Sequence, residues 1–257
     1  MSATASASPP YLDHLRAHAW MAENYAIPVG ILVAYAAHIV ILTKIMDTRE
    51  KAPTWVKPLK AVWDIVLSVM SGLGAMSVVP ILLSSLQEKG FVEEVCTSTL
   101  QIEHPVLYFF MWSKFLELFD TTLIILSKKK LIFLHWYHHM ATLMYCWDAF
   151  ILHNPSGSIF GCMNLSVHTI MYAYYAATYF GRLPNGLRVV ITSLQLLQMV
   201  VGVVAVITHL QCDNTEGALK TNSQYALAMY FSYFFLFGKL FYDSYVVKKP
   251  VKKTKSV

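Results

Sequence analysis

The chain has 257 residues, 56% of them hydrophobic, and a formal net charge of +5 at pH 7. This apolar share excludes an ordinary soluble domain of the same length and indicates a membrane protein. The basic residues gather in the loops between apolar segments, so the positive charge indicates membrane topology and not nucleic-acid binding.

Seven segments are apolar over the roughly 20 residues that a helix needs to cross a bilayer. They are expected at residues 27–46, 62–86, 105–127, 131–153, 159–180, 187–210 and 225–247. The sequence therefore predicts an all-α polytopic membrane protein with a single domain over residues 1–257. We expect residues 1–10 to be disordered, and no cleavable signal peptide to precede the first span.

The distribution of charge predicts the topology of the seven spans. The loops after the first, third and fifth spans and the tail at residues 248–257 are rich in Lys and Arg, whereas the opposite loops are mainly acidic. Because cytosolic loops are enriched in Lys and Arg, we expect a lumenal N-terminus and a cytosolic C-terminus. Lys253 and Lys255 resemble a dilysine retrieval signal of endoplasmic reticulum membrane proteins. A basic tail that meets anionic lipid is an equal alternative.

The four cysteines divide between loops and spans. Cys96 and Cys212 fall in the two large lumenal loops, where oxidation is permitted. We expect a disulfide between them, with two free thiols as the alternative. Cys146 and Cys162 fall within spans, and we expect them to be reduced packing residues.

Three histidines crowd into the first part of the fourth span: His135, His138 and His139. Polar groups inside a membrane are costly and usually functional. Imidazole suits both proton transfer and metal binding, so this cluster predicts chemistry at membrane depth.

Other spans carry polar residues at helical spacing. In the third span, Lys114, Glu117 and Asp120 follow at steps of three and share one helical stripe, which forms either part of a site or an ion-pair ladder between helices. The fifth and sixth spans carry further polar side chains: Asn164, His168, Tyr172, Gln195 and Gln198. Each set alone is equally compatible with hydrogen bonds between helices.

The depth of these groups favours one shared site. At a rise of 1.5 Å per residue from the basic residues that flank the spans, Asp120, His138 and Gln195 lie about 10 Å inside the cytosolic face, and His168 lies deeper. This convergence predicts a single polar chamber that opens toward the cytosol.

Three classes of function use such a chamber. A metal oxidase of the desaturase type needs about eight histidines, whereas only His135, His138, His139 and His168 can meet here, so we expect no metal site. A transporter or receptor would bind a ligand in the chamber, but the clustered histidines argue against it.

The third class, acyl transfer or condensation, fits best. Histidine acts as a general base or as a nucleophile that becomes acylated, and amides and a tyrosine nearby polarise a thioester carbonyl. Basic residues at the cytosolic edge are expected to bind the phosphates of coenzyme A: Lys128, Lys129, Lys130, Arg182 and Arg188.

The motifs in spans three to six together resemble the ELO family of fatty acid elongases. They are Lys114-x-x-Glu117-x-x-Asp120-Thr121, His135-Trp136-Tyr137-His138-His139, Asn164-x-x-x-His168-x-x-x-Tyr172 and Gln195-x-x-Gln198. The resemblance covers more than a third of the chain, and the four motifs in this order are far more specific than any one of them.

The resemblance implies a fold of seven helices, six of which form a barrel around an acyl-chain tunnel. It also implies condensation of an acyl-CoA with malonyl-CoA to 3-oxoacyl-CoA, CoA and carbon dioxide, with no metal or redox cofactor. His138 would be the nucleophile, with His168 assisting at the same centre. His135 and His139 would orient His138, and Asp120 would be its carboxylate partner.

Further roles follow from the same resemblance. Asn164, Gln195 and Gln198 would position thioester oxygens, with Tyr172 beside them. Lys114 would contact substrate or, with Glu117, support the third span. The expected location is the endoplasmic reticulum membrane.

The expected partners are membrane lipid and the reductases and dehydratase of the elongation cycle, with a homodimer left open and no nucleic acid. The residues of the histidine motif are similar to those of family members that act on saturated and monounsaturated acyl chains of medium-to-long length.

Overall fold

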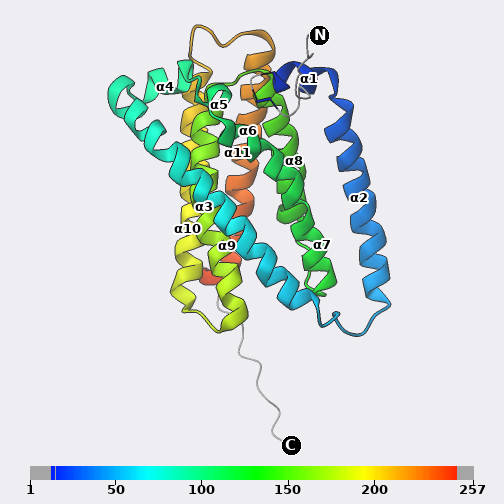
Figure 1. The fold of residues 1–257 in the computed structure, drawn as a ribbon. Helices are drawn as coiled ribbons and strands as arrows, with labels where there is room; N and C mark the ends of the chain where they lie inside the picture. Colours follow the sequence, from blue (N-terminus) through cyan, green and yellow to red (C-terminus); the bar gives the residue numbers. More distant parts are fainter. Residues whose placement is uncertain (1–12, 15, 248–257) are drawn as a thin grey trace, which may run out of the picture.

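The computed structural model describes residues 13–14 and 16–247, and every regular element in this part of the chain is helical. Residues 1–10 and the basic tail with Lys253 and Lys255 lie outside the described residues. The elements are α1 (Ala17–Glu23), α2 (Ala26–Asp47), α3 (Val56–Lys89), α4 (Phe91–Thr97), α5 (Leu100–Glu103), α6 (Pro105–Glu117), α7 (Phe119–Leu126), α8 (Phe133–Ile151), α9 (Gly157–Phe180), α10 (Asn185–His209), α11 (Gly217–Phe241) and the π-helical turn η2 (Tyr242–Val246) (Figure 1).

Each predicted apolar segment coincides with a helix, or with a helix and the shorter element that follows it, as in α6 with α7 and α11 with η2. By length and composition, three helices of the described chain are apolar enough to cross a membrane: α2, α3 and residues 186–209 of α10. The histidines, tyrosines and tryptophans of α8 lower its mean hydropathy, because residues that serve a polar interior replace aliphatic ones. The protein is thus an all-helical membrane protein.

The loops of the bundle divide between its two ends. The α2–α3 and α9–α10 connections and the end of α7 lie at the bottom of Figure 1, whereas α1, α4, α5 and the α10–α11 connection lie at the top. The loops that the sequence assigns to the cytosol therefore share one end, as an alternating topology requires. Which end faces the cytosol stays a prediction.

Close helix contacts depend on small residues. Helix α3 packs along α9, and a Cβ at Gly74 would lie 3.2 Å from a methyl group of Leu165. Between α10 and α11, a Cβ at Gly202 would lie 2.5 Å from the ring of Tyr230. Interhelical packing in membranes favours such small residues because they let backbones approach closely.

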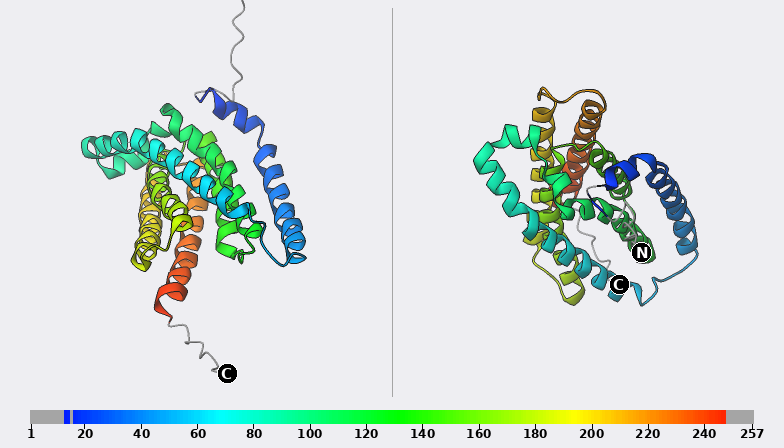
Figure 2. Two further views of the ribbon diagram at one scale, coloured as in Figure 1. Left: turned by 60° about the horizontal axis from the view of Figure 1, so that its bottom comes forward. Right: turned by 45° about the horizontal axis from the view of Figure 1, so that its top comes forward.

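Helix α2 stands at the edge of the bundle in both views of Figure 2. Its polar contacts reach α7: the Tyr35 hydroxyl lies 2.6 Å from Oγ1 of Thr121, and Nε2 of His38 lies 2.9 Å from Oγ1 of Thr122. Most of its remaining surface is exposed and apolar, as a lipid-facing helix requires.

A tightened turn separates α6 from α7. The backbone amides of Leu118 and Thr121 bond to carbonyls three residues earlier, as in a 3₁₀ turn. This turn interrupts the α-helical hydrogen bonds between Glu117 and Asp120.

The ends of α4 and α10 are joined covalently. Cys96 and Cys212 form a disulfide with their Cα atoms 5.7 Å apart, which is the pairing that the sequence favoured. The side chain of Asn214 also donates to the carbonyl of Cys96 at 2.8 Å. Cys146 and Cys162 are free thiols inside the bundle.

Candidate active site

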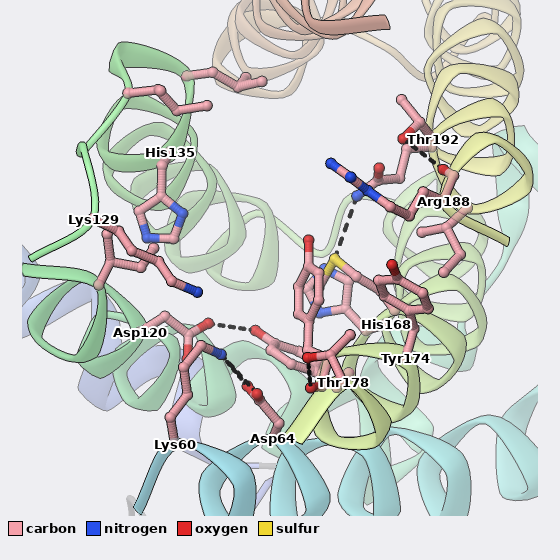
Figure 3. Close-up of a pocket in the computed structure, with 18 of the residues that line it drawn as sticks. Lys60, Asp64, Asp120, Lys129, His135, His168, Tyr174, Thr178, Arg188 and Thr192 are labelled. Carbon is pink, nitrogen blue, oxygen red and sulfur yellow. Dashed lines mark hydrogen bonds and ion pairs between the residues drawn. The ribbon is translucent and has the colours of Figure 1, made fainter. Parts of the chain in front are cut away.

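A cavity of about 720 Å³ opens among α3, α7, α8, α9, α10, α11 and η2, and we call it the chamber. Figure 3 shows Asp120, His135 and Lys129 on one wall and Arg188 and Tyr174 on the opposite wall. No residue that lines the chamber comes from α2, which agrees with its peripheral place.

The chamber brings together most of the predicted site. The predicted residues that line it are Asp120, Lys129, His135, His138, His139, Asn164, His168, Tyr172, Arg188, Gln195 and Gln198. They come from helices far apart in the sequence, so the single polar site deduced from depth is present. Lys114, Lys128, Lys130 and Arg182 do not line it.

The three clustered histidines share one side of α8. The ring centroids of His135 and His139 are 4.4 Å apart, and those of His138 and His139 are 5.5 Å apart. His138 also packs on Tyr233 of α11 at 4.8 Å. The Tyr233 hydroxyl donates to the backbone carbonyl of His138 at 3.1 Å, which fixes α8 against α11.

His135 is held by a residue of the neighbouring helix α7. Its Nε2 lies 3.0 Å from Oγ1 of Thr121, the same hydroxyl that contacts Tyr35 of α2. Thr121, the last residue of the third-span motif, is completely buried. It therefore connects the histidine cluster to α7, a role that the sequence did not reveal.

Asp120 has partners other than the one predicted. Trp63 Nε1 donates to its Oδ1 at 2.6 Å, and the Tyr172 hydroxyl donates to its Oδ2 at 2.6 Å. These two contacts engage both carboxylate oxygens of Asp120. That Asp120 is also the carboxylate partner of His138 stays a prediction. The hydroxyl proton of Tyr172 is likewise engaged in this contact.

Four buried polar side chains form a closed ring beside the chamber. Lys114 donates to Glu117 and, at 3.0 Å, to Oδ1 of Asn164. Asn164 Nδ2 lies 3.1 Å from Nε2 of His168, and Nδ1 of His168 lies 3.7 Å from a carboxylate oxygen of Glu117. Lys114 was predicted to contact substrate, but the structure commits its ammonium group to this ring.

The two glutamines of α10 face the chamber with different surroundings. Nε2 of Gln195 lies 3.3 Å from the thioether sulfur of Met171, which leaves its carbonyl oxygen free for a ligand. Gln198 is buried and lines the deeper part with Met199. The pair supplies neutral donors and acceptors and no charge.

The polar end of the chamber, which we call the mouth, is lined by four cationic side chains: Lys57, Lys60, Lys129 and Arg188. Lys57 and Lys60 lie one helical turn apart at the start of α3. They were not predicted as site residues, although they belong to the basic loop after the first predicted span. Their ammonium groups lie over the rings of Tyr179 and Tyr175, at 5.5 Å and 5.3 Å from the centroids.

Three residues predicted to line the mouth lie elsewhere. Lys128 donates to the backbone carbonyls of Met46 and Arg49, and so closes the C-terminal end of α2. Lys130 and Arg182 are exposed and do not reach the chamber. The sequence positions of these residues did not distinguish them from Lys129 and Arg188. Whether a side chain points into the chamber depends on the rotation of the helix end that carries it.

Ligand groups for a metal do not gather in this part of the molecule. Among the described residues, no three His, Cys, Asp or Glu side chains have an arrangement that could hold a metal ion. The chamber instead combines amides, hydroxyls and imidazoles with the carboxylates of Asp64 and Asp120 and with cations at its mouth, where Lys60 is paired with Asp64 at 2.7 Å.

These features define a helical membrane protein with a buried histidine chamber and a basic mouth. Comparison with known sequences agrees: the model of the ELO family (GNS1/SUR4) matches residues 20–254. The chain therefore belongs to the ELO family, and its function is fatty acid elongation.

Individual relatives give the same result. The chain is 38% identical to very long chain fatty acid elongase 6 of Gallus gallus, over 89% of this chain and 88% of that one. It is 36% identical to putative fatty acid elongase 3 of Caenorhabditis elegans, over 95% and 79%. It is 31% identical to fatty acid elongase 2 of Trypanosoma brucei brucei, over 91% and 93%.

Proposed function

We propose that this protein condenses a fatty acyl-CoA with malonyl-CoA, and that the reaction passes through an acyl group on His138. The observation that carries the proposal is the chamber, in which His138 and His168 share one cavity with a cationic mouth. Imidazole acts as nucleophile or acid–base group, and cations bind phosphates. The chamber thus suits an acyl group carried by a phosphate-bearing molecule.

The first half-reaction loads the enzyme. A ring nitrogen of His138 attacks the thioester carbonyl, the C–S bond breaks, and CoA leaves with the proton of the ring. His139 packs beside His138, and His135 packs beside His139, so that the two rings would hold His138 in place. The amides of Gln195, Gln198 and Asn164 face the chamber, where they can polarise the thioester oxygen.

The second half-reaction extends the chain. Malonyl-CoA loses carbon dioxide, and the resulting carbanion attacks the acyl carbon while the bond to His138 breaks. The departing nitrogen takes up a proton, which we assign to Nε2 of His168, the remaining imidazole of the chamber, after solvent has protonated that nitrogen. Decarboxylation supplies the carbanion in place, so no strong base is needed.

The substrates enter with their phosphates at the mouth. Lys57, Lys60, Lys129 and Arg188 would bind the phosphates of CoA, and the acyl chain would extend away from the mouth between the helices. In this proposal α3, α6 with α7, and α8 to α11 form a six-helix barrel around the chain. The mouth faces the cytosol, and the protein lies in the endoplasmic reticulum membrane beside the reductases and dehydratase of the cycle.

The substrates that we propose are saturated or monounsaturated acyl-CoAs of medium-to-long chain length. Two observations support this choice: the spelling of the histidine motif, and relatives from several animals that are named very long chain fatty acid elongase 6. Incubation with acyl-CoAs of graded length and analysis of the products tests this choice.

The variant His138→Ala tests the chemistry. We expect it to fold, because His138 is only partly buried and its side chain makes ring contacts alone, and to lose condensation of acyl-CoA with labelled malonyl-CoA by at least ~100-fold. The matched control is His38→Ala on the peripheral helix α2, which keeps activity. Full activity of His138→Ala would place the chemistry elsewhere.

Two other functions have their own signatures in the same preparation. A His-box metal oxidase would contain iron on elemental analysis and would give desaturated or hydroxylated lipid. A lipid transporter would bind acyl-CoA without turning it over. Either result would contradict condensation.

A further inference from the structure

Glu117 contacts the chamber only through another residue. Together with Lys114 it forms an ion pair in which each residue is 3% exposed, whereas Asn164 and His168 are each 8% exposed. The pair lies on α6, and its two partners lie on α9. A buried ion pair contributes little net stability, so stability alone gives a weak reason for its presence.

The donors and acceptors of this ring determine the state of His168. Lys114 can only donate, so the atom of Asn164 that faces it is the carbonyl oxygen. The amide nitrogen of Asn164 therefore faces Nε2 of His168, which must accept. A neutral imidazole that accepts at Nε2 carries its proton on Nδ1, and Nδ1 faces Glu117 at 3.7 Å.

The charges around His168 determine when its protonated form is tolerated. Lys114 and His168 share Asn164 and Glu117 as partners, so the Lys114 ammonium group opposes a positive charge on the imidazole. The Glu117 carboxylate balances that ammonium group and lies beside Nδ1. A protonated His168 is therefore tolerated while Glu117 is charged, and it is opposed when Glu117 is neutral.

We propose that Glu117 is a positioning residue, which sets the tautomer of His168 and supports its charged form during the second half-reaction. This inference rests on the proposed function, in which His168, once protonated at Nε2, gives that proton to the departing nitrogen of His138. Protonation at Nε2 ends the hydrogen bond from Asn164 and turns this nitrogen into a donor. Glu117 touches neither substrate nor reacting atoms and acts through His168.

The test uses a double variant, since Glu117→Gln alone would leave an unpaired buried charge on Lys114. Lys114→Met with Glu117→Gln removes both charges, approximates both shapes and keeps a carbonyl oxygen opposite Nδ1. The matched control is Lys239→Met with Asp243→Asn, which removes an exposed ion pair that does not line the chamber. Both proteins are compared with the wild type in each half-reaction.

The first half-reaction is measured as CoA release from acyl-CoA alone, and the second as carbon dioxide release when carboxyl-labelled malonyl-CoA is added to the loaded enzyme. We expect the double variant to load within a few-fold of the wild-type rate and to release carbon dioxide ~10–100-fold more slowly. The control pair should change neither rate.

Two results would overturn the inference. Wild-type rates for both half-reactions would show that the pair is dispensable, and equal slowing of both would show a purely structural role. Failure of the proposed function is seen separately, in the wild type: if it releases no CoA before malonyl-CoA is added, the covalent route falls, and with it the assignment of Glu117 to one half-reaction.

Discussion

At the scale of single residues, the chamber depends on how each polar group is satisfied. His135 is held by Thr121, Asp120 by Trp63 and Tyr172, and His168 by Asn164. Buried polar groups are costly unless they are hydrogen-bonded, so these contacts fix where each group points. His138 lies on the chamber wall, and within the described residues its side chain makes ring contacts and no hydrogen bond, so a ring nitrogen stays available for a nucleophilic role.

The variant Asp120→Asn tests whether Asp120 supports the structure or takes part in the reaction. In Asp120→Asn, one of the two donors, Trp63 or Tyr172, would face an amide NH₂ group instead of an oxygen. We expect a loss of about 1–3 kcal/mol in the free energy of unfolding, measured by thermal denaturation in detergent, and less than tenfold loss of activity in the folded protein. Loss of activity with unchanged stability would support Asp120 as a catalytic partner.

At the scale of elements, two helix starts and one connection between helices form the mouth. The start of α3 supplies Lys57 and Lys60, the α7–α8 connection supplies Lys129, and the start of α10 supplies Arg188. Arg182 in the α9–α10 connection has the same charge but does not line the chamber. The effect of positive charge at this end of the bundle can therefore be tested separately from the effect of a cation that lines the mouth.

We predict that Arg188→Ala raises KM for acyl-CoA and malonyl-CoA about tenfold and leaves kcat nearly unchanged. The reason is that a phosphate contact binds ground state and transition state equally. Arg182→Ala is the matched control, with KM expected within twofold of the wild type. Equal effects of the two substitutions would show that bulk charge at this end, and not the lining of the mouth, attracts the substrates.

Helices α6, α8 and α9 continue past the histidines toward the other end of the bundle. There they enclose a second, small cavity of about 20 Å³, lined by residues that include Phe110, Cys146 and Phe160. Cys146 lies two turns along α8 from His139, so an acyl chain on His138 that followed these helices would end here.

Filling this cavity should shorten the longest product. We expect Cys146→Leu to lose elongation of its longest acyl-CoA substrates and to keep activity on shorter ones, at a stability cost of about 1–3 kcal/mol from overpacking. Cys146→Ala removes volume and should keep the product range, which product profiling can compare directly. An unchanged product range in Cys146→Leu would place the end of the acyl tunnel elsewhere.

At the scale of the whole molecule, periodicity and charge predicted the long helices well. The apolar segments fell on α2, α3 and α8 to α11, because a helix in a bilayer must be apolar over its full length and its loops carry the topology signal. The break between α6 and α7 was missed, since no Pro or Gly marks Leu118 and the change is a local tightening of hydrogen bonds.

The sequence predicted which residues belong to the site better than it predicted which atoms those residues contact. Spacing brought the polar residues to one depth. The direction of a side chain depends on helix rotation, which turned Asp120 toward Trp63 and Tyr172 and buried Lys114. The missed residues, Lys57 and Lys60, carried a usable signal: two lysines one turn apart at a helix start at the same end of the bundle as the mouth.

The central claim is that His138 carries the acyl group before malonyl-CoA takes part. The most direct measurement mixes purified protein with acyl-CoA alone and follows free CoA by thiol detection and the acylated protein by mass spectrometry. We predict one CoA released per active site, with an added acyl mass on the peptide that contains His138 and none in His138→Ala. If no CoA is released until malonyl-CoA is present, the acyl-histidine route is contradicted.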